Sequence, residues 1–181
     1  MSPYQQALGD EFGAMPKLCQ ALHSGPGTFQ GEITVESAFG RVVTLLGFPK
    51  PVALAPFSLR ISQAADCEIW ERQIGPNRLR SEQFATQDGL LAEKMGPVLA
   101  NTYLKAHAKG IDHIIRSVHV FGVLVPRALS PRISAREWQE SGRYRFDVRV
   151  RAPIVNVTVL RYHGWLNVMD HACQATSPTN I

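Results

Sequence analysis

The sequence predicts one mainly antiparallel β domain whose strands close into a barrel around an apolar cavity. About ten strand-length runs follow one another at intervals of roughly 8–12 residues, and short turn motifs separate them. A parallel sheet would need crossovers of a dozen or more residues, which these short connections do not provide. A barrel is favoured over a sandwich because closure removes exposed strand edges. We therefore expect a lipocalin- or calycin-like barrel of about 8–10 strands with short N-terminal helices.

The composition fits a single globular domain. The chain has 181 residues, of which 45% are hydrophobic and 19% are charged, enough apolar side chains to bury a core. We expect the barrel to span residues 1–168 and residues 169–181 to form a flexible tail. No run approaches the roughly 18 apolar residues of a membrane helix, and the start lacks the basic-then-apolar pattern of a secretion signal. A cytoplasmic protein without a membrane span is expected.

The first segment predicts helices. Between residues 3 and 23, apolar side chains recur at spacings of three and four, which is typical of one helical face. Gly13 and Pro16 interrupt this stripe, so two short helices packed on or over one end of the barrel are expected.

The strands are predicted by alternation. The clearest is Arg143–Arg151, in which Tyr144 and Phe146 share one face with two valines while arginines occupy the other. Residues 41–48 form a short apolar piece that periodicity assigns to neither helix nor strand. The predicted strands are 28–36, 57–63, 68–74, 78–86, 90–95, 99–108, 111–121, 132–139, 143–151 and 155–168.

The apolar segment Val120–Leu129 has no clear strand pattern. It is either a hydrophobic plug at the barrel mouth or a contact surface for a partner. We expect a packed plug, because exposed apolar patches of this size are uncommon.

Charge and cysteine content exclude some classes of protein. The net charge is +4, and eight arginines lie between Arg127 and Arg161. They alternate with apolar residues, which predicts a solvated strand face and no nucleic-acid partner. The odd number of cysteines, Cys19, Cys67 and Cys173, predicts buried thiols instead of a disulfide framework or zinc site.

Several stretches resemble a known family. PRALSPRISAREWQESGRYRFDVRVRAPIVNVTVLRYHGWL, EIWERQIGPNRLRS and YQQALGDEFGAMPKLCQALH together resemble the bacterial domain-of-unknown-function family DUF4166. The most specific pieces are REW, RFDV and RYxGWL. The resemblance implies one intact domain, found in this family alone or fused behind saccharopine-dehydrogenase-like domains. It implies no activity.

Glu137 is the first candidate for chemistry. It shares a strand face with Ile133 and Ala135, opposite Trp138. If this face points inward, desolvation raises the pKa of the carboxyl and poises it as an acid or base. The alternative is a buried salt bridge to an arginine, with Trp138 on the inner face.

Glu93 is a second candidate, because it shares a face with Leu91 and Met95. Two carboxylates in one cavity suit acid–base catalysis, since their repulsion separates their pKa values. Solvent exposure of Glu93 is the alternative.

Trp70 and Arg72 share one face of their strand. Such a pair can form a stacked site for a carboxylate or enolate, or a purely structural cation–π pair. Arg80, across the next turn, either adds a second positive charge or lies in water.

The histidines do not predict a metal site. His113 and His119 share parity on one strand, but six residues of strand span about 20 Å, too far for a common metal. His107 is expected to face Asp112 across a surface turn, and His119 is a candidate base in the cavity. No phosphate-loop or nucleophile motif occurs either, so no cofactor is predicted.

The function hypothesis follows from the barrel. We expect it to hold a hydrophobic small molecule, with cofactor-independent cyclase or isomerase chemistry inside the cavity. A non-catalytic carrier and an interaction module for a dehydrogenase-like partner remain alternatives, and a homodimer is left open. The candidate catalytic residues are Glu137, Glu93 and Arg72, and the candidate ligand-binding residues are Trp70, Arg80, His119, Trp138, Tyr144, Phe146 and Tyr162.

Overall fold

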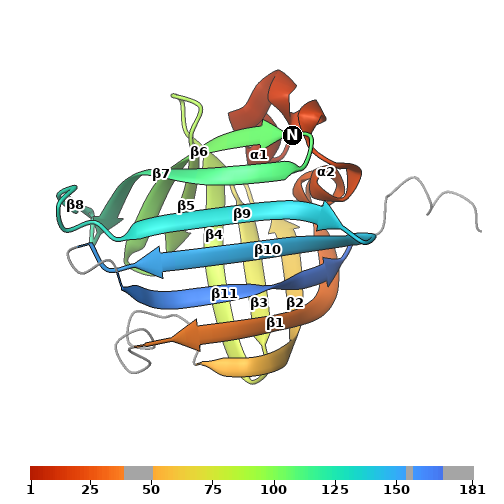
Figure 1. Ribbon diagram of the computed structural model, residues 1–181. Coiled ribbons are helices and arrows are strands. Elements are labelled where there is room, and N and C mark those ends of the chain that lie inside the picture. The colour runs from red at the N-terminus through yellow and green to blue at the C-terminus, as the bar shows by residue number, and fades with distance from the viewer. Residues whose placement is uncertain (39–50, 154–156, 169–181) are drawn as a thin grey trace, which may run out of the picture.

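Ten antiparallel strands form a closed barrel in the computed structural model, which describes residues 1–38, 51–153 and 157–168 (Figure 1). Neighbouring strands pair in the order β6-β5-β4-β3-β2-β1-β11-β10-β9-β7, and pairing of β6 with β7 closes the ring. The predicted barrel is confirmed. The strands are β1 (Gly27–Ser37), β2 (Val52–Gln63), β3 (Glu68–Ile74), β4 (Asn77–Ala85), β5 (Leu91–Met95), β6 (Val98–His107), β7 (Gly110–Val120), β8 (Val123–Leu124), β9 (Arg132–Glu140), β10 (Arg143–Arg151) and β11 (Thr158–Asn167).

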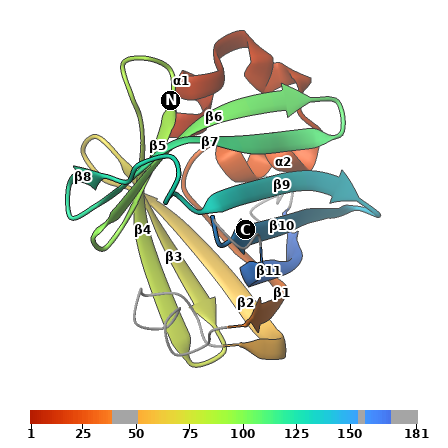
Figure 2. The ribbon, with the colours of Figure 1, turned by 60° about the vertical axis from the view of Figure 1, so that its left-hand side comes forward.

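The N-terminal segment forms α1 (Pro3–Leu8), a 3₁₀ turn (Gly9–Ala14) and α2 (Lys17–His23). Ser2 caps α1 through a capping box with Gln5, and the apolar stripe breaks near Gly13 and Pro16 as expected. The helix α1 packs against β4, β5 and β6, whereas α2 packs against β9 and β10. These helices therefore cover one end of the barrel, the helix end (Figure 2).

The opposite end, here called the far end, is where β3, β5, β7 and β10 end. In Figure 1 the far end runs from the left, where β8 projects from the barrel, to the bottom, where β3 turns into β4. The expected plug at Val120–Leu129 is wrong. β7 and β8 form a hairpin whose turn residues, Phe121 and Gly122, both have positive φ, and this hairpin carries the segment away from the core into solvent.

Some predicted boundaries shift in the structure. β2 begins at Val52, five residues before the expected start at Phe57. The strand runs through Pro56 instead of beginning after it. The apolar piece 41–48, the expected tail 169–181 and Cys173 lie outside the described residues. None of the described helices has the length and apolar character that a bilayer crossing requires.

A bulge in β7 changes which side chains point inward. Thr102 pairs with Ile115 but Asn101 pairs with Ser117, so Arg116 is the extra residue. The bulge inverts the alternation of side chains along β7 beyond this point. As a result, His113 and His119 do not share a face, contrary to the sequence pattern.

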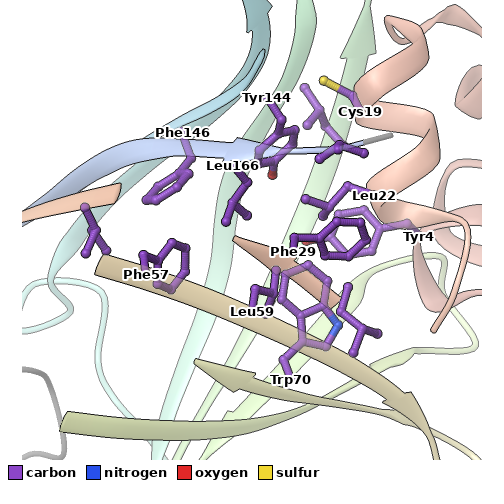
Figure 3. Close-up of a cluster of buried hydrophobic side chains, with 14 of the residues drawn as sticks. Tyr4, Cys19, Leu22, Phe29, Phe57, Leu59, Trp70, Tyr144, Phe146 and Leu166 are labelled. Atoms are coloured by element: carbon purple, nitrogen blue, oxygen red, sulfur yellow. The ribbon is translucent and has the colours of Figure 1, made fainter. Parts of the chain in front are cut away.

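The core lies between the helices and the inner wall of the barrel. Tyr4 and Leu22 from the helices meet Trp70 and Leu59 from the strands (Figure 3). Cys19 is buried in the same core, and burial raises the pKa of its thiol to about 12, which suits a structural thiol.

Candidate functional site

The barrel encloses a cavity of ≈ 140 Å³. Its lining changes in character along the barrel axis. Toward the far end the wall is apolar and includes Ile74, Met95, Ile133 and Val150, whereas charged and hydrogen-bonding side chains lie closer to the helix end. The polar and aromatic lining residues are Tyr4, Phe57, Trp70, Arg72, Gln83, Glu93, Thr102, His113, Glu137, Tyr144, Phe146 and Tyr162.

Glu137 points inward with Ile133 and Ala135, and only 9% of it is exposed. Nε2 of His23 donates a hydrogen bond of 2.6 Å to Oε2, and Nε2 of His113 lies 3.2 Å from Oε1. Burial acts to raise the pKa of Glu137, but the two imidazoles outweigh it and hold the pKa well below 4.5. The expected raised pKa is therefore wrong in direction: the structure shows a buried ion pair, formed with histidines and not with an arginine.

His113 is the partner that also lines the cavity. Burial acts to lower its pKa, but the Glu137 carboxylate outweighs this and raises the pKa above 6.5. The proton of the pair therefore resides on the imidazole, and His113 is the group that can present it to a ligand.

His23 lies behind Glu137, outside the cavity lining. Its ring is fully buried and stacks on Tyr4 at 3.7 Å between centroids, with an interplanar angle of 21°. The Trp70 ring lies beside this pair, 5.8 Å from the centroid of His23 and 6.0 Å from that of Tyr4. The hydroxyl of Ser2 donates a hydrogen bond to the carbonyl of His23. These contacts fix the imidazole so that it orients the carboxylate.

A second ion pair joins Arg72 to Glu93 across the strands β3, β4 and β5. The guanidinium lies 2.9 Å from Oε1 of Glu93 and donates to Oγ of Ser81 at 2.7 Å, and this hydroxyl donates to the same carboxylate oxygen. Burial acts to raise the pKa of Glu93, but Arg72 outweighs it and the pKa is lowered. Arg72 also lies 5.1 Å from the centre of the Trp70 ring, as the sequence suggested.

Glu93 and Glu137 thus border one cavity, but each has its own cationic partner. The two carboxyls do not share a proton. Among the described residues, no three His, Cys, Asp or Glu side chains are arranged to share a metal ion, although two histidines flank Glu137.

One buried acceptor in the wall has no partner. Gln83 is only 2% exposed, lines the cavity, and its Oε1 forms no hydrogen bond with the described residues. A buried amide oxygen in this state favours a donor group on a ligand.

Seven of the ten predicted site residues line the cavity: Glu137, Glu93, Arg72, Trp70, Tyr144, Phe146 and Tyr162. The other three do not. Arg80 is exposed and pairs with Glu82, Trp138 alternates with Glu137 and faces outward, and the β7 bulge turns His119 away. These placements correct the prediction of Arg80, Trp138 and His119 as ligand-binding residues.

Sequence reasoning missed Tyr4, His23 and Gln83, and it treated His113 only as a metal ligand. The strand periodicity of Gln83 and His113 could have found them, since both share parity with inward apolar residues. Tyr4 and His23 have no such signal, because they lie on helices whose docking position is set by tertiary structure.

The outer wall near β7 and β9 also carries a wide, solvent-open hollow, lined in part by His107, Asp112 and Arg136. Asp112 in this hollow is paired: Arg136 contacts it at 2.9 Å and His107 contacts it at 3.4 Å. The predicted contact of His107 with Asp112 is confirmed. The barrel cavity is the better candidate site, because it holds the buried ion pairs of Glu93 and Glu137 and the unpartnered amide oxygen of Gln83.

Comparison with known proteins identifies the family but no activity. The family model for a domain of unknown function (DUF4166) matches residues 15–166. No curated protein matches the chain. Among solved structures, a protein of M. tuberculosis, Rv2717c, is similar at 9% identity with a TM-score of 0.47, over 86% of this chain and 99% of that one.

Proposed function

The chain belongs to the domain-of-unknown-function family DUF4166, and from this premise we propose that the protein binds a small, uncharged, mainly apolar molecule in the barrel cavity. The observation that carries this proposal is the mixed cavity wall, in which the paired charges of Arg72–Glu93 and Glu137–His113 lie among apolar side chains that extend to the far end.

The size of the cavity limits the ligand. A cavity of ≈ 140 Å³ is close to the roughly 150 Å³ that holds benzene in an engineered protein. The ligand is therefore about the size of one six-membered ring.

The charges of the wall favour a neutral ligand. Arg72 is compensated by Glu93, and Glu137 is compensated by His113. A charged ligand would leave one buried charge without a partner, which is strongly destabilising. The unpartnered Oε1 of Gln83 favours a hydroxyl or N–H donor on the ligand.

Isothermal titration calorimetry with three ring-sized probes tests the proposal. We expect phenol to bind at least tenfold more tightly than benzene, because it supplies one donor, and benzoate to bind weakest. The variant Gln83→Met keeps the volume but removes the acceptor, so phenol should lose its advantage over benzene. If benzoate binds best, Arg72 recognises carboxylates and the neutral-ligand proposal is wrong. If none of the three binds, the cavity proposal itself fails.

A second candidate function rests on the contact of His113 with Glu137. A protonated imidazole on a cavity wall, paired with a carboxylate that His23 orients, can give a proton to a bound carbonyl compound and take one back. This would support a cofactor-independent isomerase or cyclase, in which the α-proton of a ketone is removed and returned.

Deuterium incorporation into cyclohexanone in D₂O, followed by NMR, tests this second function. We expect the protein to accelerate exchange at the α-carbons, and Glu137→Gln to slow it at least tenfold. If the protein binds phenol but does not accelerate exchange, it is a carrier and not an isomerase.

A further inference from the structure

We propose that the far end of the barrel docks on the surface of an anionic lipid bilayer. Docking would involve the segment Phe121–Leu129 and the rim of the barrel beside it.

The far end gathers most of the exposed large hydrophobic side chains of the described chain. On the segment itself, Phe121 is 82% exposed, Val123 70%, Leu124 56% and Leu129 58%. Leu54 at the start of β2 and Val157 just before β11 lie at the same end and are also exposed. Leu54 lies across the ring from β7, but the four exposed apolar side chains of the segment lie together, and such a cluster marks an interaction site.

The shape of the segment favours a bilayer over a flat protein interface. The hairpin of β7 and β8 projects from the barrel, as Figures 1 and 2 show. Its tip is Phe121–Gly122, where positive φ values turn the chain tightly. A convex tip with an exposed phenylalanine can enter the boundary between headgroups and acyl chains without a matching pocket.

The charge of the segment is complementary to anionic lipid. No Asp or Glu occurs between His113 and Arg136. Arg127 and Arg132 are exposed, and neither forms an ion pair with a described residue. Cations beside inserted apolar side chains are the usual combination at an anionic membrane surface.

The position of the segment relates docking to the cavity. The ladder between β7 and β9 ends at Ile114 and Ser134, and β7 then continues into the hairpin with β8. Ile115 and Ile133, the next residues beyond the ladder, both line the cavity. The docking segment therefore continues directly from strands whose Ile115 and Ile133 form the apolar part of the cavity wall.

Co-flotation of the full chain with vesicles tests docking directly. We expect binding to vesicles of phosphatidylcholine mixed with phosphatidylserine, and little binding to phosphatidylcholine alone. The variant Arg127→Gln/Arg132→Gln should bind about fivefold more weakly for each arginine removed. Its matched control is Lys105→Gln/Lys109→Gln, which makes the same change in net charge near the helix end and should bind as the parent does.

A second pair of variants tests the apolar contribution. Phe121→Ser/Leu124→Ser changes only exposed side chains, so its thermal unfolding should match that of the parent while its vesicle binding is lost. Ile114→Ser, on the outer wall of β7, is the control and should retain binding.

Two results would overturn the proposal. One is equal binding of the Arg127/Arg132 and Lys105/Lys109 variants, which would show a non-specific effect of net charge. The other is absence of vesicle binding by the parent. If Phe121→Ser/Leu124→Ser then breaks a dimer of the chain, the segment is a contact between two copies and not a membrane-docking site. Because this assay requires no ligand in the cavity, its failure is distinct from failure of the calorimetry.

Discussion

The carboxylate of Glu137 keeps its charge inside the barrel because an imidazole lies on each of its two oxygens. A carboxyl in an apolar pocket without such partners would be protonated at neutral pH. The same side chain in the same strand can therefore be an acid or an anion, and its neighbours decide which. Here they transfer the proton to His113.

The proton on His113 makes the stability of the folded protein depend on pH. The pKa of His113 is raised above 6.5 in the folded protein, so the folded state holds the proton more tightly than the unfolded chain does. The resulting stability is complete below pH 6.5 and is lost as the pH rises through the raised pKa. We expect the free energy of unfolding to fall over this range, as measured by urea denaturation at a series of pH values.

The variant His113→Gln identifies the source of this dependence. It keeps a polar side chain beside Glu137 but cannot hold the proton, so the fall in stability above pH 6.5 should flatten. An unchanged slope in this variant would show that another group is responsible.

At the scale of elements, the barrel depends on strands that approach unusually closely. β1 and β11 are paired along their length, and Gly31 lies against the backbone of Trp165. A Cβ at position 31 would lie 1.9 Å from the carbonyl oxygen of Trp165. No side chain can be accommodated there unless the two strands separate.

Gly31→Ala should therefore lower the free energy of unfolding by about 2–4 kcal/mol, as measured by urea denaturation. The control is Gly13→Ala, where an added Cβ meets no atom within 4 Å, and it should stay within about 0.5 kcal/mol of the parent. Equal stability of the two variants would contradict the close packing of β1 on β11.

Elements also show where periodicity is sufficient and where it is not. Strand alternation correctly grouped Tyr144 with Phe146, and Glu93 with Leu91, on shared faces, because side chains of a regular strand alternate strictly. It failed for His119, because one extra residue at the β7 bulge reverses the alternation. It also failed for Val120–Leu129, because apolar composition does not reveal whether a segment is covered.

At the scale of the whole molecule, the cavity is a consequence of how ten strands and two short helices close around it. The helices supply Tyr4 and His23 at one end, and the wall of the barrel supplies the rest. Small side chains such as Ala135 leave part of the space unfilled.

Filling that space should abolish binding without unfolding the protein. Ala135→Leu adds apolar volume inside the cavity, so calorimetry with phenol should show at least a tenfold loss of affinity. The thermal unfolding temperature should be unchanged or higher, since the added methyl groups are buried in existing space.

Ser134→Leu is the matched control, because the preceding residue faces outward on the same strand. It should bind phenol as the parent does. If Ala135→Leu also binds like the parent, phenol does not occupy the cavity.

The sequence by itself determined the closed antiparallel barrel, the short N-terminal helices and which residues of a regular strand share a face. These depend on local periodicity and turn chemistry, which are properties of neighbouring residues. Only the tertiary structure decided which cation meets each carboxylate, that His23 and Tyr4 reach the site, and that Val120–Leu129 is exposed. The physical reason is that pKa and burial depend on groups brought together across the barrel. His23 and Glu137, 114 residues apart, show no trace of this contact in the sequence.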